Sequence, residues 1–439
     1  MIEVMFKKRI TNKLEKYVAK YFRKHPDIKL IAVAGSVGKT SSKLAIATLL
    51  SEKYRVRLHS GNHNTHLSAP LAILGIDFPG DPRNIWEWLK VFSAARKRIK
   101  APSENEPQVI IQELGTDQPG DIAEFGRYLQ PDIAVVTAVA PEHMEFFGNL
   151  NAVAREELTV ADFSKMVILN RDAIAAEFSN LIHNPNFTTY GTTVSAEYNF
   201  EIDDLDLPEG YLGKFNTPEF GQIAARVRIF GEHSLLPVTS AVAVAAKMGL
   251  SAQEIASGLA KIQPVPGRMN FLRGVEGSIL IDDTYNSSPA AAEAALRTLY
   301  NLPVPSRIAI LGDMNELGNS SMEEHQKLGH FCDPLSLSWV ITVGEEANRF
   351  LAPAARARGC QVKTCQNAIE AATFARQVLE KGAAVLLKGS QGNIYLEEAT
   401  KIMLASNDDI KFLVRQDEKW QKIKDEFFQS LAVIEEDEV

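Results

Sequence analysis

The chain has 439 residues, 45% of them hydrophobic and 23% charged, and a formal net charge of −8. This length predicts two or three domains, and the negative charge argues against a dedicated nucleic-acid-binding protein. No apolar run is long enough to span a membrane, and the basic N-terminus lacks the apolar core of a secretory signal. The three cysteines (Cys332, Cys360 and Cys365) have the spacing of neither a zinc site nor a disulfide framework, so we expect a reducing, cytoplasmic location.

The first predicted element is an amphipathic helix within an N-terminal segment of residues 1–28. Apolar residues recur every four positions over residues 10–24, at Ile10, Leu14, Val18 and Phe22. This helix leads directly into an apolar run, residues 30–34, which predicts the first strand of the next domain.

Residues 29–50 predict a strand, a glycine loop and a helix that together bind a nucleotide. The run Gly-Ser-Val-Gly at 35–38 follows the strand, and Lys39-Thr40-Ser41 opens the helix. Such a loop presents backbone N–H groups and a helix N-terminus to phosphates. Lys39 is expected on the β- and γ-phosphates and the Thr40 hydroxyl on Mg²⁺. The nucleotide-binding set is Gly35, Ser36, Gly38, Lys39, Thr40 and Ser41.

This loop departs from the general phosphate-loop pattern in one position. That pattern has a glycine five positions before Gly38, where this chain has Val33. The match is to the shorter GxxGKT[ST] form, and an ordinary strand-to-helix turn is the alternative interpretation. The flanking strand and helix favour nucleotide binding.

Residues 77–106 form an insertion with a predicted helix at 84–100. Ile85, Trp88, Leu89, Phe92 and Ile99 are expected on one face, and the last turns are basic. We interpret it as a surface helix packed on its domain, with cations favoured at the helix C-terminus. The alternative is an aromatic and basic face for a membrane surface or a lipid-linked partner, which one short helix would bind only weakly.

The remaining pattern predicts two α/β domains. Strands at 54–58, 108–112, 131–138 and 166–170 alternate with helices, which indicates a doubly wound parallel sheet, and residues 195–230 add a small antiparallel patch. The Pro- and Gly-containing run 263–268 marks the boundary between a central domain at 29–265 and a second domain at 266–415. The second domain is Rossmann-like without a GxGxxG loop. Residues 416–439 are expected to be a tail.

Polar residues at strand ends extend the candidate site. Glu113 ends an apolar strand and is a candidate second ligand for Mg²⁺, with a helix-capping acid as the alternative. His143 follows another strand within an acidic neighbourhood (Glu142, Glu145, Glu156 and Glu157), which suggests a second cation, although an isolated histidine is more often structural.

Two further candidates lie past the domain boundary. Arg268 follows Pro266-Gly267 and is placed to contact phosphate oxygens, or is simply a surface arginine in a linker. The run Asp282-Asp283-Thr284-Tyr285-Asn286 has the groups needed for ribose and adenine, or Asp283 caps the next helix.

Seven motifs in order give the chain a resemblance to the Mur ligase family over about residues 25–420. They are GSVGKTS at 35–41, ELG at 113–115, EHME at 142–145, PGR at 266–268, DDTYN at 282–286, GDMNELG at 312–318 and KGS at 388–390. The last three motifs most resemble the branch that adds D-alanyl-D-alanine to UDP-N-acetylmuramoyl tripeptide. An ordered set is far more specific than any single motif.

The resemblance implies ATP-dependent amide synthesis through an acyl phosphate, with ATP and Mg²⁺ as cofactors. By motif, Lys39 binds phosphates, Thr40 and Glu113 hold one Mg²⁺, and His143 holds the second. Nucleotide contacts from the second domain are carried over to Arg268, Asp283 and Asn286. Asn62 and Asn64 match the asparagines of the family's GNxN loop near the acyl phosphate, and Lys388 and Ser390 match a substrate-side loop.

Three departures from the family pattern affect these assignments. Where many members have a carbamylated lysine, the run 153–159 places Glu157, so we predict that Glu157 is a metal-site acid. Gly231-Glu232-His233 is followed by Ser234 instead of the expected asparagine, which leaves one nucleotide contact of the family without an assigned residue. Only 34 residues precede Gly35, too few for the family's domain that binds uridine diphosphate, so the acceptor is either held differently or is another, lipid-linked or free, molecule.

The sequence therefore predicts a cytoplasmic, monomeric Mur-type ligase of peptidoglycan precursor synthesis. Its expected partners are a muramoyl-peptide acceptor and D-alanyl-D-alanine or another amine. One alternative is a related ligase of the folylpolyglutamate or cyanophycin type. The other is a nucleotide-binding partner subunit without ligase activity.

Overall fold

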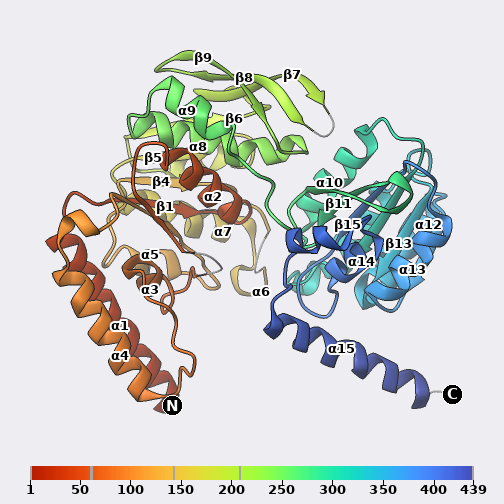
Figure 1. Cartoon of the computed structure of the whole chain (residues 1–439), viewed down its shortest axis with the longest axis horizontal. Coiled ribbons are helices and arrows are strands. Elements are labelled where there is room, and N and C mark those ends of the chain that lie inside the picture. Colours follow the sequence, from red (N-terminus) through yellow and green to blue (C-terminus); the bar gives the residue numbers. More distant parts are fainter. Residues whose placement is uncertain (1, 60–62, 142–143, 207–208, 438–439) are drawn as a thin grey trace. The chain divides into compact units, whose positions relative to one another are not determined.

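The computed structural model describes residues 2–59, 63–141, 144–206 and 209–437. They fall into two compact units, one of residues 1–228 with 235–262 and the other of residues 229–234 with 263–439 (Figure 1). Each unit combines a mostly parallel sheet with helices, so the predicted α/β fold class is confirmed. No helix in the described ranges has the length and apolar character needed to cross a bilayer.

The first unit is built on a nine-stranded sheet whose order is β2-β3-β1-β4-β5-β6-β7-β8-β9. Its strands run parallel from β2 to β7, and β8 and β9 continue it antiparallel as the predicted patch. The strands are β1 (Lys29–Ala34), β2 (Val56–Leu58), β3 (Val109–Glu113), β4 (Ile133–Val136), β5 (Val167–Asn170), β6 (Phe187–Gly191), β7 (Tyr198–Asp206), β8 (Gly210–Thr217) and β9 (Gly221–Val227).

Both faces of the parallel part are covered by helices, which is why its strands are apolar throughout rather than alternating. Leu30, Ala32 and Ala34 face the core beneath α1, α3, α4, α5 and α7, while Ile31 and Val33 are buried on the other face. That other face carries α2, α8 and α9. The helices are α1 (Ile2–Lys24), α2 (Lys39–Leu50), α3 (Ala69–Leu74), α4 (Ile85–Lys100), α5 (Asp121–Phe125), α6 (Met144–Phe147), α7 (Leu150–Leu158), α8 (Leu235–Lys247) and α9 (Ala252–Leu259), with short 3-10 turns η1 (Ser103–Asn105), η2 (Thr159–Phe163) and η3 (Ala176–Leu181).

Helices α1 and α4 lie side by side at one end of this unit (Figure 1). The insertion helix begins at the N-cap Asn84, as expected, and buries Trp88, Val91, Phe92 and Ala95. The expected apolar face is wrong in part, because Ile85 and Leu89 are 55% and 47% exposed. Both residues lie in the first two turns of α4, before Phe92, which packs against Tyr17 of α1.

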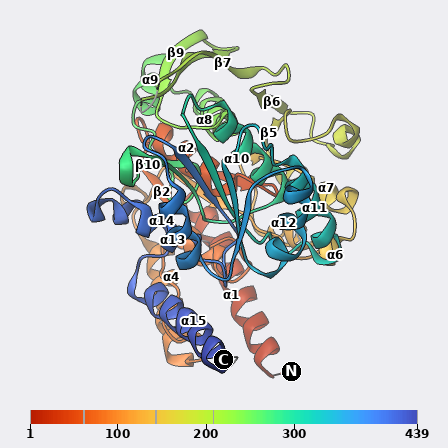
Figure 2. The ribbon, with the colours of Figure 1, turned by 90° about the vertical axis from the view of Figure 1, so that its right-hand side faces the viewer.

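The second unit contains a six-stranded sheet in the order β10-β11-β15-β12-β13-β14, parallel except for β10. Figure 2 shows α13 and α14 on one side of these strands and α11 and α12 on the other, the doubly wound arrangement that the sequence predicts. The strands are β10 (Asn270–Arg273), β11 (Ile279–Asp283), β12 (Arg307–Gly312), β13 (Trp339–Val343), β14 (Val362–Cys365) and β15 (Ala384–Lys388).

The helices of this unit include one long C-terminal helix where only a tail is expected from the sequence. They are α10 (Pro289–Asn301), α11 (Ser321–Phe331), α12 (Ala352–Ala357), α13 (Ala368–Val378), α14 (Leu396–Met403) and α15 (Glu418–Asp437), with the short turns η4 (Glu232–Ser234), η5 (Val275–Gly277), η6 (Gly318–Ser320), η7 (Ala347–Leu351) and η8 (Asn407–Phe412). Lys424 on α15 is 2% exposed and pairs with Glu398, so this helix packs on its unit.

Candidate active site

The glycine loop between β1 and α2 has the conformation that a phosphate-binding loop requires. Gly35 has a φ of +121°, and a Cβ there would lie 2.3 Å from Thr137 Oγ1. Gly38 has a φ of +90° and is the N-cap of α2. Both positions favour glycine, since other residues rarely adopt these angles and the strand β4 region approaches Gly35 closely.

The loop is fixed by hydrogen bonds to the segment that follows β4. The Ser36 N–H donates to the Ala138 carbonyl at 3.0 Å, and the Ala140 N–H donates to Ser36 Oγ at 3.1 Å. Glu157, on α7, accepts the Gly35 N–H at 2.7 Å, and its side chain is buried. Glu157 is therefore placed on the phosphate loop itself, where its carboxylate orients the backbone.

Three predicted nucleotide-binding residues begin helix α2. Lys39 is folded over the loop, with Nζ donating to the carbonyls of Gly35 and Ser36 at 2.5 and 3.3 Å. Thr40 Oγ1 donates to Glu113 Oε2 at 3.2 Å, and Ser41 follows in the same turn. A hydroxyl and a carboxylate, both oxygen donors of the kind Mg²⁺ prefers, thus meet at the end of β3 beside the loop.

Glu113 has two more partners, one of which the sequence analysis missed. Lys43 Nζ lies 3.2 Å from Glu113 Oε2, and both side chains are buried. Asn64 Nδ2 donates to Glu113 Oε1 at 3.4 Å, so the predicted GNxN asparagine is brought to the same carboxylate. Lys43 is four positions after Lys39 on α2 and so shares its helix face, which is the signal that would have identified it.

The acidic residues predicted around His143 that the structure describes contact different parts of the unit. Glu156 accepts the N–H groups of Gly120 and Ile122 at 2.7 and 2.6 Å, whereas its neighbour Glu157 holds the phosphate loop. The predicted residues Asn62 and His143, with Glu142, lie outside the described residues. Among the described residues, no three His, Cys, Asp or Glu side chains form a group able to hold a metal ion by themselves.

In the second unit, a buried ion pair joins two predicted site residues. Lys388 Nζ, at the end of β15, donates to Asp283 Oδ2 at 2.6 Å and to the Asn286 carbonyl at 3.2 Å. Asp283 also accepts the Met269 N–H at 3.2 Å. The motifs that the sequence assigns to the nucleotide and to the substrate therefore form one cluster at neighbouring strand ends, because β11 and β15 are parallel partners.

Ser390 extends this cluster toward the loop after β12. Its side chain is buried, its hydroxyl donates to the Ser287 carbonyl at 3.3 Å and it accepts the Asn315 N–H at 2.9 Å. The loop at 388–390 is thereby held to two other motifs, the one after β11 and the one after β12.

Arg268 has an unsatisfied donor suited to an anion. Its guanidinium lies over the Tyr285 ring, with Cζ 4.2 Å from the ring centroid. Its Nε is buried and has no hydrogen-bond partner among the residues that the structure describes. A buried cationic donor without an acceptor is costly, so this arrangement favours a phosphate or carboxylate ligand at Arg268.

Asp282 and Asp283 are neighbours in sequence, but only Asp283 has a cation as its partner among the described contacts. Complete burial raises the pKa of Asp282 to about 7, although the Thr284 hydroxyl and the Gly267 N–H donate to its carboxylate at 2.6 and 3.0 Å. Asp283 instead has the cation of Lys388. Asp282 therefore has a structural role, holding the Gly267 backbone next to Arg268.

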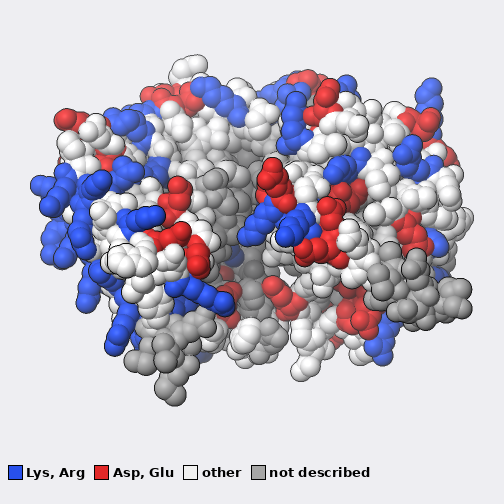
Figure 3. Space-filling view, turned by 60° about the horizontal axis from the view of Figure 1, so that its bottom comes forward, with Lys and Arg blue, Asp and Glu red and all other residues white. Residues whose placement is uncertain are grey.

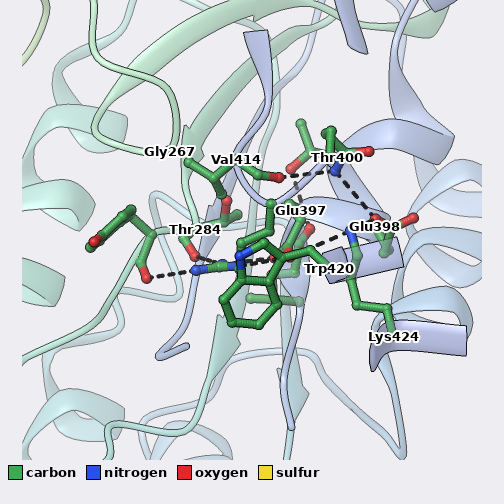
Figure 4. Close-up of polar contacts among 12 residues, drawn as sticks. Gly267, Thr284, Glu397, Glu398, Thr400, Val414, Trp420 and Lys424 are labelled. Carbon is green, nitrogen blue, oxygen red and sulfur yellow. Dashed lines mark hydrogen bonds and ion pairs between the residues drawn. The ribbon is translucent and has the colours of Figure 1, made fainter. Parts of the chain in front are cut away.

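Arg415 is a further residue that sequence reasoning missed, and it holds the loop after β11 through contacts that include Thr284 and Glu397, both labelled in Figure 4. Its guanidinium donates to both oxygens of Glu397 at 2.8 Å, to the Thr284 carbonyl at 2.6 Å and to the Tyr285 carbonyl at 3.1 Å. Lys424 pairs with Glu398 in the same network. No motif marks Arg415, since the carbonyls that it holds lie about 130 positions earlier in the chain.

The chain matches two family models over most of its length. The model of the Mur ligase middle domain matches residues 33–245, and that of the Mur ligase glutamate ligase domain matches residues 267–391. The first range includes the phosphate loop, Glu113 and Glu157, and the second includes Arg268, Asp283 and Lys388.

Individual relatives agree with this assignment. UDP-N-acetylmuramoyl-tripeptide–D-alanyl-D-alanine ligase of Bacillus subtilis is 26% identical over 398 residues, which are 89% of this chain and 79% of that protein. A crystal structure of MurF from Acinetobacter baumannii is 25% identical with a TM-score of 0.72, covering 88% of this chain and 79% of that one. MurF ligase from Thermotoga maritima in complex with ADP, 22% identical, shares the fold with a TM-score of 0.73 over 91% of this chain and 84% of that one. With both domain models matched in order, the chain belongs to the Mur ligase family of ATP-dependent, ADP-forming peptide ligases.

Proposed function

We propose that this ligase joins D-alanyl-D-alanine to the terminal carboxylate of a muramoyl-peptide acceptor. The observation that carries the proposal is the Thr40–Glu113 contact at the start of α2, on a phosphate loop whose conformation requires Gly35 and Gly38. The substrate assignment is drawn from the relatives, whose names specify the tripeptide and the dipeptide. We place the reaction in the cytoplasm because it consumes ATP.

In the proposed reaction, a carboxylate oxygen of the acceptor attacks the γ-phosphorus of ATP. The bond from that phosphorus to the β,γ-bridging oxygen breaks, which gives an acyl phosphate and ADP. The amine nitrogen of D-alanyl-D-alanine then attacks the acyl carbon, the carbon–oxygen bond to phosphate breaks, and the nitrogen loses a proton. Catalysis of such steps depends chiefly on holding the reactants in line and on stabilising phosphate charge.

The residues of the first unit have distinct parts in this reaction. Lys39 moves from the Gly35 and Ser36 carbonyls to the β- and γ-phosphates, whose negative charge is the stronger acceptor. The N–H groups of the loop and the N-terminus of α2 bind phosphate oxygens. Asn64 lies at Glu113, so it is positioned to contact the acceptor carboxylate next to the γ-phosphate.

The donor atoms fit Mg²⁺ as the accompanying ion. Thr40 and Glu113 supply two oxygen ligands, and Mg²⁺ sites of this kind are completed by water and phosphate oxygens. When bound, the ion neutralises charge on the phosphates. Glu157 and His143 remain the predicted residues for a second ion, with the Glu157 carboxylate also holding Gly35.

The second unit is assigned to the remainder of the nucleotide and to the amine substrate. Arg268 offers its unpaired Nε to a phosphate, and Asp283 and Asn286 are assigned to the nucleoside. Lys388 and Ser390 fix the loop that is assigned to the amine substrate.

The proposal is tested by measuring phosphate release from ATP with UDP-N-acetylmuramoyl tripeptide, with and without D-alanyl-D-alanine. We expect release to require both substrates and the product mass to equal their condensation. Release that never depends on an amine would exclude the ligase reaction. Release with glutamate and a folate acceptor instead would assign the chain to the folylpolyglutamate type.

A further inference from the structure

The ends of helices α1 and α4 form a surface that the ligase reaction does not use. Ile85, Trp86 and Leu89, which we call the apolar tip, are 55%, 71% and 47% exposed. They lie in the first two turns of α4, next to the cap at Asn84. Single exposed hydrophobic residues are ordinary, but three adjacent ones of this size on one helix end mark an interaction surface.

The buried side of α4 does not explain these residues. Trp88, Val91, Phe92 and Ala95 pack inward, and the steps of three and four residues between them define one face. The exposed positions lie beside and opposite this face, and they are apolar in the first turns and basic afterwards: Ile85, Trp86, Leu89, Lys90, Ser93, Arg96, Lys97 and Lys100. The exposed face of α4 is therefore itself amphipathic along its length.

Helix α1 packs beside α4 and carries further cations. Lys13 Nζ lies 3.9 Å from the centroid of Phe92, and Arg96 Nε donates to Tyr17 Oη at 3.2 Å. Both contacts join residues 79 positions apart, so the two helices run parallel where they touch. The first turns of α1, which lead up to these contacts, add the exposed cations Lys7, Lys8 and Arg9.

The two helices have a charge that is opposite to that of the chain as a whole. Together they contain 13 lysines and arginines against three acidic residues, all glutamates, whereas the whole chain contains 47 lysines and arginines against 55 aspartates and glutamates. Figure 3 shows this gathering of Lys and Arg side chains on the left side of the view, over α1 and α4. A basic surface of this kind is attracted to an anionic partner.

We propose that the end formed by α1 and α4 docks on the surface of an anionic phospholipid bilayer. The apolar tip inserts between headgroups, where a tryptophan ring is favoured, and the surrounding cations contact lipid phosphates. Charge complementarity selects the anionic lipid, and the aliphatic residues of the tip select a bilayer over a soluble polyanion. The inference is independent of the ligase reaction, so it is tested without ATP or substrates.

The experiment is flotation of the full chain with vesicles of phosphatidylcholine containing phosphatidylglycerol, and with vesicles of phosphatidylcholine alone. We expect binding to the anionic vesicles that is about tenfold or more stronger than to neutral ones and that falls as NaCl is raised. The triple variant Ile85→Ser, Trp86→Ser, Leu89→Ser is expected to lose about tenfold or more in binding. Its matched control changes three exposed hydrophobic residues of the second unit, Met322→Ser, Leu335→Ser, Ile369→Ser, and is expected to bind like the unmodified chain.

The charge contribution is tested separately by Lys90→Glu, Lys97→Glu, Lys100→Glu. A cation near an anionic surface contributes about fivefold to partitioning, so this variant is expected to lose most of its vesicle binding. Lys381→Glu, Lys419→Glu, Lys422→Glu is the control with equal net charge on the other unit.

A further readout does not depend on how the triple variant folds. Brominated acyl chains should quench tryptophan fluorescence in the bound chain, and Trp86→Phe should remove that quenching. No binding to anionic vesicles, equal binding to neutral ones, or binding unchanged by both sets of variants would each overturn the proposal. If the chain does not bind anionic vesicles, a protein partner that covers the apolar tip becomes the hypothesis to test.

Discussion

Lys43 and Glu113 form a buried ion pair in which Nζ lies 3.2 Å from Oε2. The carboxylate that the sequence assigns to Mg²⁺ is therefore bound to a cation of the protein, and it also accepts the Thr40 hydroxyl. Lys43 and a metal ion would both neutralise the same charge. This relationship gives a way to separate the structural role of Glu113 from its catalytic role.

Glu113→Gln is expected to lower the free energy of unfolding by about 3 kcal/mol, because Lys43 loses its buried carboxylate partner. It should also lower kcat by about a hundredfold and raise the Mg²⁺ concentration for half-maximal rate. Urea unfolding and phosphate release at varied Mg²⁺ measure the two effects.

The double variant Glu113→Gln, Lys43→Met is the control for this prediction. Removing both charges should recover most of the stability while the Mg²⁺ response stays impaired. If Glu113→Gln has the Mg²⁺ dependence of the unmodified enzyme, Glu113 is not a metal ligand.

Glu157 is predicted to be a metal-site acid, and its contact with Gly35 allows a two-variant test. Glu157→Gln keeps an acceptor for the Gly35 N–H but removes the charge, whereas Glu157→Ala removes both. If Glu157 is a metal ligand, both variants should lose about tenfold or more of their Mg²⁺-dependent turnover. Turnover that survives in Glu157→Gln but not in Glu157→Ala would instead assign the residue to loop positioning.

Arg415 is expected to position the loop after β11. Arg415→Lys cannot donate to both Glu397 oxygens and to the carbonyls of Thr284 and Tyr285, so we expect a loss of about 2–3 kcal/mol in stability and a higher KM for ATP. Arg273→Lys is the matched control, because its side chain is 83% exposed and pairs with Asp409 only at 3.8 Å. The control should change stability by less than about 0.5 kcal/mol. A normal KM in Arg415→Lys would separate this residue from the nucleotide site.

Asp282 should make the second unit less stable as pH rises. Burial raises the pKa of its carboxyl from 3.8 to about 7, so the folded protein holds a proton that the unfolded chain releases. The contribution of this bound proton to the free energy of unfolding is complete below pH 3.8. It declines by about 1.4 kcal/mol per pH unit between pH 3.8 and 7, and above pH 7 it is lost.

Asp282→Asn removes this titration, which makes it the reference for the measurement. Unfolding of both proteins in urea is compared across the pH range, and the difference in stability should follow the window above. The amide shifts stability by a constant amount through its own hydrogen bonds, so only the slope is diagnostic. A difference that does not vary with pH would show that Asp282 is ionised in the folded state.

The sequence by itself determined the phosphate loop, the two α/β patterns and the residues at strand ends. These features follow from local chemistry, since an apolar run, two glycines and Lys39-Thr40 are contiguous in the chain. Parallel strands also bring their carboxyl ends to one edge, which makes Glu113 and Asp283 visible as candidates before any fold is known.

Only the tertiary structure decided how these groups are paired. Lys43 meets Glu113 and Arg415 meets Thr284 across long separations in sequence, and no local pattern encodes such contacts. Helix periodicity places Ile85 and Trp88 on neighbouring positions, yet Trp88 packs against Phe78 and Phe92 and is buried, whereas Ile85 is exposed. Whether a side chain is buried depends on which other elements pack around it, whereas its position on the helix depends only on the spacing of residues in the sequence.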